Sequence, residues 1–582
     1  MSSATLASLL PLPVVILIVG AAVCPLAARI SARAPVVVAV LSCGGAAGVL
    51  ALFAPAVLDG RLLVEYLGKW EPVRGAALGI AFAADPLGLS YALAATVVGM
   101  ILAVFTLSML GGLGRRELGG YACLFLLLDA ALVGVALTAD LFNLFVWFEV
   151  AALASYALTG FFLERPTALE AAFKILVLTT MASFCVFIGT GLLYASYGAL
   201  NFGQLHEALR HGTDPTSLIA LGLLVAGYGT KAGVVPFHGW LPDAHTAAPG
   251  PVSALFSGLM VTLGIVGIAR ITFQIYDQPP PVLGVLMVVA LVSALVGALL
   301  SLGQDDLKRL LAYDTVSQLG VVTAGLAIGT PLGLAGATYH LLNHTLFKSL
   351  LFLCAGTVLH STGKERLSEL GGLGRRMPVV AVAFVVGIVA IAGVPPLNGY
   401  ASLGLIHQGL EETHQYAALV VLTISQVVTV AALSRAAWLV FFRRRSERYP
   451  SRESARPGMV AGFAALAVLC VAFGVAPAVL LSEVMAPAAG WLLEGERYAH
   501  AVLAGGGQVG RLPLSFDYLA PATILVVVGT VVVGVLLAWR YAGGRTPRFV
   551  EPLRRLHTGS VNDYATYLVV GLIVVCAGLL LG

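Results

Sequence analysis

Long apolar runs separated by short polar segments follow one another along the whole chain. About 20 helical residues cross a bilayer core of about 30 Å, and the runs predict about 16 such spans. We expect them at residues 8–28, 35–56, 86–112, 119–138, 141–163, 168–197, 217–240, 249–275, 280–303, 308–329, 332–360, 378–408, 415–442, 457–481, 521–540 and 564–581. The predicted fold class is therefore an all-α polytopic membrane protein.

The composition agrees with a chain embedded in lipid. Of the 582 residues, 59% are hydrophobic and only 11% are charged, whereas a soluble domain carries about 25% charged residues. Basic residues are not interleaved with aromatic ones in any cluster, so we expect no nucleic-acid partner. The seven cysteines lie in apolar runs and form no CxxC pair, and we predict neither a metal site nor a cofactor.

Lysine and arginine are distributed unequally between alternate loops. If the N-terminus is outside, the cytoplasmic loops hold about three times as many basic residues as the outer loops, as the positive-inside rule requires. This asymmetry predicts a multi-pass protein of the cell membrane (inner or plasma membrane) with both termini on the outer side.

A short string occurs twice within long apolar spans. Ala232–Trp240 reads AGVVPFHGW, and Ala392–Tyr400 reads AGVPPLNGY. The first copy contains Pro236, and the second contains Pro395 and Pro396; proline interrupts a helix because it lacks a backbone donor. Irregular backbone at membrane depth survives only where protein buries it or where it lines a wet cavity. Paired interrupted helices therefore indicate a transport site.

Ionisable residues within the spans are the main candidates for function, because a charge at the bilayer centre costs at least about 2.5–3.5 kcal/mol. Glu149 and Lys231 are the first pair, since a carboxylate and an ammonium respond to each other's charge when a proton moves nearby. His340, His344 and Lys348 recur every fourth residue and share one helix face, where imidazoles can relay protons. We predict a proton or cation path along these residues.

Other charged residues admit a purely structural interpretation. Each could pair with a charge on a neighbouring helix or extend its charged end to the membrane surface. Asp129 is a further candidate for the path, and so are Lys174 and Arg435, although both lie where they can reach the interface. Asp314 follows the charged segment 305–309, and we expect it to be a loop or interface partner.

Five strings in the middle of the chain carry a family resemblance. They are ADLFNLFVWFE (139–149), KAGVVPFHGWLPDA (231–244), DLKRLLAY (306–313), HLLNHTLFK (340–348) and VPPLNG (394–399). In order and spacing they resemble the antiporter-like subunits shared by respiratory complex I, Mrp-type sodium/proton antiporters and membrane-bound energy-converting hydrogenases. The string LHTG at 556–559 is similar to the longer members.

The resemblance implies an organisation and a set of roles. It implies two inverted five-helix repeats at 119–275 and 276–442, each with a broken helix, preceded by helices 1–3 (1–118) and followed by helices 14–16 (443–582). It implies that Glu149 and Lys231 form the charge pair of a first half-channel. His340, His344 and Lys348 would belong to a central axis that carries protons. The expected partners are other membrane subunits, besides the lipid bilayer and the transported proton or sodium ion.

Two positions depart from the family pattern. Many members carry Lys or His in the middle of the eighth span, where this chain has Thr262. Many also carry Lys or Glu shortly after the second break, where it has Leu403, which cannot carry a proton. His407 lies about one turn further along the helix and is the candidate substitute. Otherwise the second half-channel is altered or closed.

The leading hypothesis is a proton- or sodium-translocating subunit of a multisubunit membrane complex, in which any redox chemistry belongs to the partners. One alternative is a subunit of an antiporter complex without a redox partner. Another is a membrane subunit that serves a soluble catalytic protein, as in inorganic-carbon uptake, or a structural subunit with an altered second half-channel. The uncharged Thr262 and Leu403 favour this last group.

Overall fold

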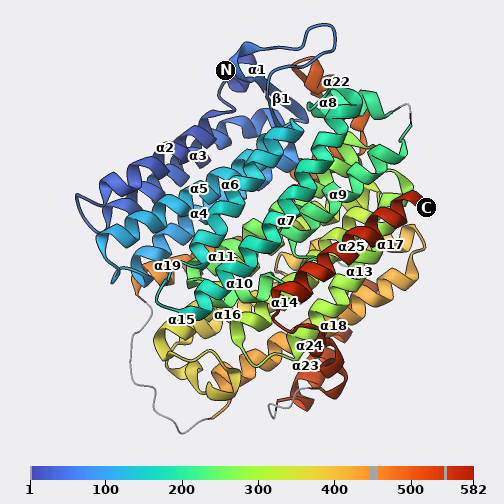
Figure 1. The fold of residues 1–582 in the computed structure, drawn as a ribbon. Coiled ribbons are helices and arrows are strands. Elements are labelled where there is room, and N and C mark those ends of the chain that lie inside the picture. The colour runs from blue at the N-terminus through green and yellow to red at the C-terminus, as the bar shows by residue number, and fades with distance from the viewer. Residues whose placement is uncertain are drawn as a thin grey trace.

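The computed structural model describes residues 3–210, 212–444, 456–510, 512–518, 520–542 and 547–581. Helices make up most of it (Figure 1). The first part contains α1 (Ser3–Ala7), α2 (Leu12–Ala27), α3 (Ala34–Leu58), β1 (Arg61–Tyr66), β2 (Ala81–Ala84), α4 (Pro86–Met109), α5 (Arg115–Leu137), α6 (Leu141–Thr159), α7 (Pro166–Tyr197), α8 (Phe202–Leu209), α9 (Pro215–Ala232), α10 (Leu241–Ala247), α11 (Gly250–Leu255) and α12 (Val261–Ala269). The second part contains α13 (Pro280–Leu302), α14 (Leu307–Ala327), α15 (Pro331–Thr362), α16 (Pro378–Ile391), α17 (Gly399–Glu412), α18 (Tyr416–Ala437), α19 (Pro457–Val475), α20 (Pro477–Leu480), α21 (Ala486–Leu493), α22 (Gly495–Leu503), β3 (Gly506–Gln508), α23 (Pro521–Arg540), α24 (Glu551–Leu556) and α25 (Val561–Leu581).

The helices confirm a multi-pass, all-α membrane protein. Within the described ranges, 14 helices are long and apolar enough to cross a membrane, or 15 if the bent pair Pro477–Leu493 and Gly495–Leu503 is one span. The predicted span 217–240 is helical only as α9, and α10 begins directly after it. The predicted span 378–408 is divided into α16 and α17. The sequence did not predict the bent pair, and the number of 16 spans stays a prediction.

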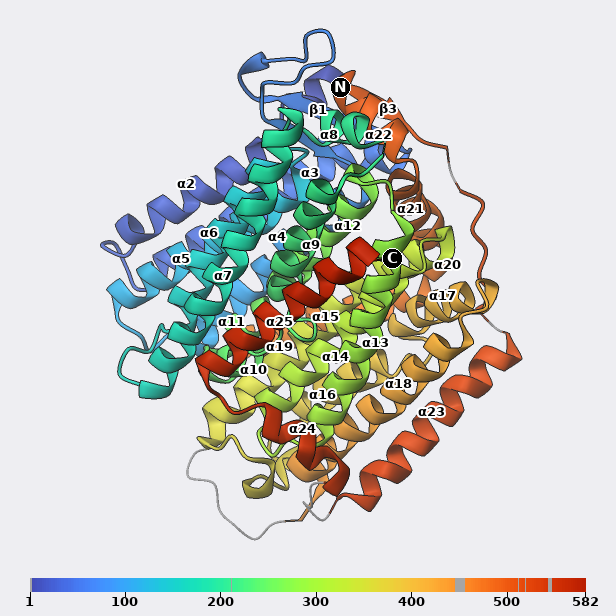
Figure 2. The ribbon, with the colours of Figure 1, turned by 45° about the vertical axis from the view of Figure 1, so that its right-hand side comes forward.

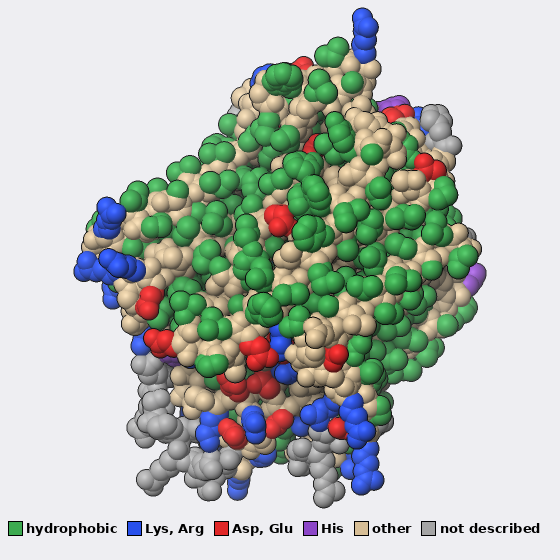
Figure 3. Space-filling model, in the orientation of Figure 1, with side chains coloured by type: hydrophobic (Ala, Val, Ile, Leu, Met, Phe, Trp, Pro, Cys, Tyr) green, Lys and Arg blue, Asp and Glu red, His purple; other side chains and the backbone are tan. Residues whose placement is uncertain are grey.

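The long helices run side by side in roughly one direction, and hydrophobic side chains cover most of the face seen in Figure 3 (Figures 1, 2 and 3). Burial differs sharply between them. The most apolar stretches of α14 and α15 are 100% buried, whereas those of α23 and α25 are only 17% and 28% buried. The molecule therefore has a protein-enclosed centre at α14 and α15, and peripheral helices that present apolar faces outward.

Both proline strings interrupt a helix. The first break (residues 233–240) begins at Gly233 with φ +70°, and the second break (392–398) contains Gly393 with φ +68°, a backbone conformation that favours glycine. The peptide bonds before Pro236 and Pro396 are cis. Both breaks thus lie at the prolines that the sequence singled out.

Neighbouring side chains satisfy the backbone groups that the breaks expose. In the first break, Trp240 Nε1 donates to Thr230 O at 2.7 Å, and Val235 N donates to Ser293 Oγ at 2.9 Å. In the second break, Asn343 Nδ2 donates to the Asn398 carbonyl at 2.7 Å. Protein contacts therefore replace the lost helical hydrogen bonds at membrane depth.

A small sheet closes the end of the molecule that carries the N-terminus (Figure 2). Strand β1 pairs antiparallel with β2 and with β3, which comes from residues more than 400 positions later. The sequence analysis did not predict this sheet. It joins the beginning of the chain to the segment after α22.

Candidate functional site

Glu149 and Lys231 lie near each other, but no direct ion pair between them is found within the described residues. Lys231 is in the last turn of α9, directly before the first break, and its side chain is fully buried. Its Nζ lies 5.3 Å from the centroid of the Phe148 ring, a distance typical of a cation–π contact. Glu149 is the residue after Phe148 on α6 and is only partly buried.

Three buried polar atoms around this pair have no hydrogen-bond partner within the described part of the chain. They are Glu149 Oε1, Lys231 Nζ and Tyr228 Oη. The great majority of buried polar atoms in proteins are hydrogen-bonded, so each exception requires an explanation. Three exceptions at one place single it out as a candidate polar site.

Lys348 forms a direct ion pair with Asp314, and both side chains are fully buried. Lys348 Nζ also donates to the Leu311 carbonyl at 3.2 Å. The expectation that Asp314 is a loop or interface residue was wrong. Helix α14 begins at Leu307, so Asp314 lies two turns inside the enclosed bundle.

Both ring nitrogens of His340 have hydrogen-bond partners. Its Nε2 lies 3.0 Å from Gln318 Oε1, and its Nδ1 lies 2.9 Å from Ser402 Oγ on α17. Asn343 Nδ2 donates to the same hydroxyl at 3.0 Å. Since Gln318 Oε1 only accepts, His340 carries its hydrogen on Nε2, and Nδ1 can accept a further proton.

His344 completes the predicted stripe on α15, and it approaches a histidine that the sequence analysis missed. His245 on α10 stacks on Phe352 with ring centroids 4.8 Å apart. Both ring nitrogens of His344 and of His245 are buried and have no hydrogen-bond partner in the described ranges. The charge of Lys348 acts on both rings. His245 directly follows the string 231–244, so its position after the break was the available signal.

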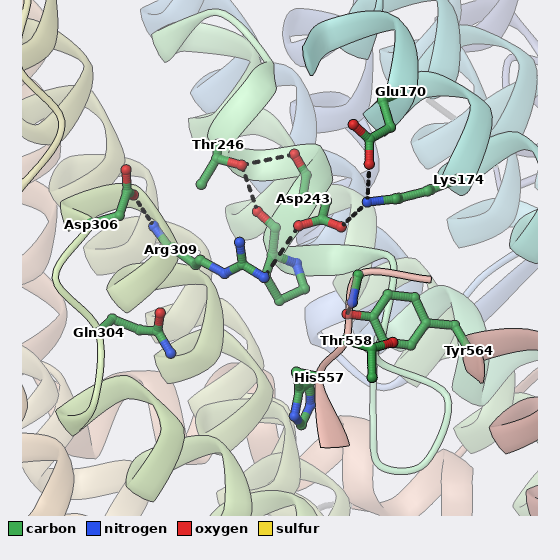
Figure 4. Close-up of polar contacts among 12 residues, drawn as sticks. Glu170, Lys174, Asp243, Thr246, Gln304, Asp306, Arg309, His557, Thr558 and Tyr564 are labelled. Carbon is green, nitrogen blue, oxygen red and sulfur yellow. Dashed lines mark hydrogen bonds and ion pairs between the residues drawn. The ribbon is translucent and has the colours of Figure 1, made fainter. Parts of the chain in front are cut away.

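Lys174 lies at the rim of a cavity of about 460 Å³ between α7, α10 and α14 (the rim cavity; Figure 4). Its ammonium lies 2.6 Å from Glu170 Oε1 and 3.0 Å from Asp243 Oδ2. Arg309 Nη2 reaches the second oxygen of Asp243 at 3.3 Å. Asp306 also lines the cavity, and burial raises the pKa of its carboxyl to about 6. Charged groups therefore line the opening.

A second cavity, of about 410 Å³, adjoins the second break between α17, α18 and α23 (the second-break cavity). Leu403 and His407 both line it, together with Glu411, Gln426 and Asp517. Gln426 Nε2 donates to the carbonyl of Ile391, the last residue of α16. The charge of His407 acts on His340, so His407 lies between the central stripe and this cavity. Leu403 adds only apolar surface.

Three further predicted residues make polar contacts with residues outside the stripe. Asp129 is fully buried among the N-terminal helices and accepts a hydrogen bond from Cys43 Sγ at 3.3 Å. Arg435 donates to Gln304 O at 3.0 Å, just after the end of α13, where a cation is favourable. Thr262 donates to Leu259 O at 2.7 Å and is fully buried.

A metal centre finds no support in the part of the chain that the structure describes, where no group of three or more His, Cys, Asp or Glu side chains is placed to bind a metal ion. The seven cysteines are free thiols. The prediction that the chain carries no cofactor of its own stays a prediction.

Sequence comparison gives a consistent family. Residues 138–429 match the model described as "NADH:quinone oxidoreductase/Mrp antiporter, TM". The chain is 36% identical over 394 residues to NADH-quinone oxidoreductase subunit N of Desulforudis audaxviator, covering 67% of this chain and 77% of that protein. It is 29% identical over 439 residues to a Na(+)/H(+) antiporter subunit from Bacillus subtilis, covering 75% of this chain and 87% of that protein.

Comparison with solved structures gives the same family as the sequence comparison. The chain superposes on a chain of the Mrp complex from Dietzia sp. DQ12-45-1b with a TM-score of 0.77 and 28% identity, covering 86% of this chain and 100% of that one. It matches a chain of the membrane-bound sulfane sulfur reductase, an archaeal respiratory membrane complex, with a TM-score of 0.77 and 26% identity, covering 87% and 100%. The protein therefore belongs to the NADH:quinone oxidoreductase/Mrp antiporter family of transmembrane subunits.

Proposed function

We propose that this chain translocates protons, or sodium ions, as an antiporter-like subunit of a multisubunit membrane complex. The observation that carries the proposal is the buried, unpartnered ammonium of Lys231 beside Glu149. A purely structural charge would be expected to sit in a hydrogen-bonded pair, as Arg270 and Asp85 do. An ammonium left without a hydrogen-bond acceptor at a helix break is instead suited to respond to a passing ion.

The route that the side chains favour runs from the rim cavity to the second-break cavity. It passes Lys231 and Glu149, then His245, the Lys348–Asp314 pair, His344 and His340. His407 would be the last group before the second-break cavity. Each step moves between ionisable or hydrogen-bonding groups inside the bundle, where a proton is shielded from lipid.

The organisation of this route follows the predicted domains. Residues 119–275 would form the first five-helix repeat and residues 276–442 the second, with residues 1–118 and 443–582 flanking them. Lys and Arg gather along the lower edge of the molecule in Figure 3, far from the labelled N-terminus in Figure 1. The positive-inside rule favours this edge as the cytoplasmic side of a cell membrane, with both termini outside.

The partners would be other membrane subunits, since the structural neighbours come from an Mrp complex and a respiratory membrane complex. The proposal has two forms: in one, the partner subunits carry redox chemistry, and in the other, the complex is an antiporter without a redox partner. A membrane subunit for a soluble catalytic protein, or a structural subunit, is the second candidate. The observation that favours it is Leu403, an apolar residue in the second-break cavity.

The experiment is translocation by the native complex in proteoliposomes, followed with a lumenal pH dye and with sodium flux. Lys231→Ala and Glu149→Ala are each expected to abolish coupled transport while the complex still assembles, because each removal leaves its partner's charge alone. Lys69→Ala, in an exposed ion pair with Glu65, is the matched control. Wild-type transport by both variants would refute the proposal.

A further inference from the structure

The C-terminal segment covers the first break, although 319 positions separate the two in the chain. Helix α25 packs along α9 and passes the break at two glycines. A Cβ on Gly239 would lie 2.6 Å from Cδ1 of Tyr564, and a Cβ on Gly571 would overlap Cγ of Pro236. No side chain fits at either place, so the break and α25 form one closely packed unit.

Two imidazoles meet where this unit faces the rim cavity. His238, within the break, has its Nε2 2.6 Å from Nε2 of His557, which directly follows α24. His557 Nδ1 lies 3.0 Å from the Leu553 carbonyl. A carbonyl only accepts, so neutral His557 carries its hydrogen on Nδ1 and accepts through Nε2. His238 is then the donor.

This assignment leaves one basic nitrogen. His238 Nδ1 is buried and has no hydrogen-bond partner within the described ranges. His557 lines the rim cavity, whereas His238 lies seven residues after Lys231 in the same break. The pair therefore joins a residue that lines the rim cavity to the break that follows Lys231.

We propose that His238 and His557 together form a proton-binding site, half of which comes from the C-terminal segment. A proton that moves along the proposed route adds to His238 Nδ1. The resulting imidazolium keeps its Nε2 hydrogen bond to neutral His557, and the bond becomes charge-assisted. A second proton would have to occupy His557 Nε2, which would place two cations and two hydrogens against each other. The site thus binds one proton and opposes a second.

The charged and titratable groups around the pair come from four other elements. Arg309 and Tyr313 face it from α14, Asp243 from α10, Tyr564 from α25, and Lys174 from α7. Burial lowers the pKa of His557 and Arg309 adds to this effect, while the Leu553 carbonyl and Asp243 oppose it. His557 is consequently neutral near pH 7, as the acceptor role requires.

The inference rests on the proposed function, because it supplies a proton site for the same route. It is tested on the native complex in proteoliposomes by measuring proton translocation from pH 5 to pH 8. The variants are His238→Gln, His557→Gln and the double variant, with His414→Gln, an exposed histidine, as control. Wild type should lose activity at the acid end, where the pair keeps its one proton and cannot pass it on. A glutamine at 557 accepts the same hydrogen bond but cannot be protonated.

Each single variant is expected to lower translocation about tenfold at neutral pH and to remove the acid loss, and the double variant should be no slower than the slower single one. Assembly should be unchanged. If His557→Gln does not assemble, His557→Asn replaces it. An unchanged pH profile, or additive losses in the double variant, overturns the site. Full transport by Lys231→Ala would instead overturn the route itself, so the two failures are distinguishable.

Discussion

The two opposite-charge pairs of this molecule are built differently. Asp314 lies eight residues after the N-cap Asp306, and Glu149 lies nine residues after the N-cap Asp140, so their carboxylates sit at similar depths in their helices. Yet Asp314 holds Lys348 in a direct, fully buried ion pair, whereas no such contact joins Glu149 to Lys231 within the described residues. A closed pair stabilises a fold, and an open pair can take up a charge from outside.

The two breaks also differ in whether a charged residue lies beside them. Lys231 directly precedes the string of the first break, and Ile391 directly precedes that of the second. The second break therefore lacks an ammonium, and the amide of Gln426 binds its exposed carbonyl instead. On the proposed route, the ionisable groups of the second repeat are therefore those on α15 and His407, and none of them lies within the break itself.

The largest expected effect is a difference in the free energy of unfolding between Lys348→Ala and Lys231→Ala. Lys348→Ala strands a buried carboxylate, which costs about 3–5 kcal/mol, and it should also stop transport. Lys231→Ala removes an ammonium that no hydrogen bond or direct ion pair holds within the described residues, so unfolding of the subunit should change by less than about 1 kcal/mol while transport is lost. Thermal unfolding of the purified complex, beside translocation, measures both. Equal destabilisation by the two changes would contradict the difference between the pairs.

The next largest effect is expected from a substitution in the second-break cavity. His407→Ala should lower translocation about tenfold if this imidazole is the proton carrier there. In a Leu403→Lys background the same change should have little effect, because the new ammonium would lie in the same cavity. The four rates, measured in proteoliposomes, form a double-mutant cycle. An unaffected rate in His407→Ala would remove His407 from the route.

The smallest effect concerns the rim cavity. Lys174→Ala should slow transport about two- to threefold, because Arg309 still binds Asp243 and the partner Glu170 is exposed to solvent. The loss should shrink as salt rises, since salt screens charges at an opening. A complete loss of transport would place Lys174 on the route itself.

Much of this arrangement follows from sequence. Apolar runs predict the bundle, proline within a run locates each break, and spacing by four places His340, His344 and Lys348 on one face. Asp314 was misjudged from its distance to a charged segment. Counting from the N-cap Asp306 would have placed it about 12 Å inside the helix.

Other features depend on contacts that no local pattern encodes. The meeting of His238 with His557 joins segments 319 residues apart. The pairing of β1 with β3 spans an even longer separation. In both cases the local sequence offers a residue type but no partner, and only packing of the whole bundle decides which segments meet.

The central claim is that Glu149 and Lys231 conduct and do not merely balance each other's charge. The most direct measurement is translocation by the double variant Glu149→Gln/Lys231→Met, in which both positions are uncharged and near native size. The account predicts that this complex assembles and unfolds like the wild type but moves no protons or sodium ions. Transport near the wild-type rate would mean that the pair serves only to keep the net charge of the core neutral, and the proposed route would be wrong.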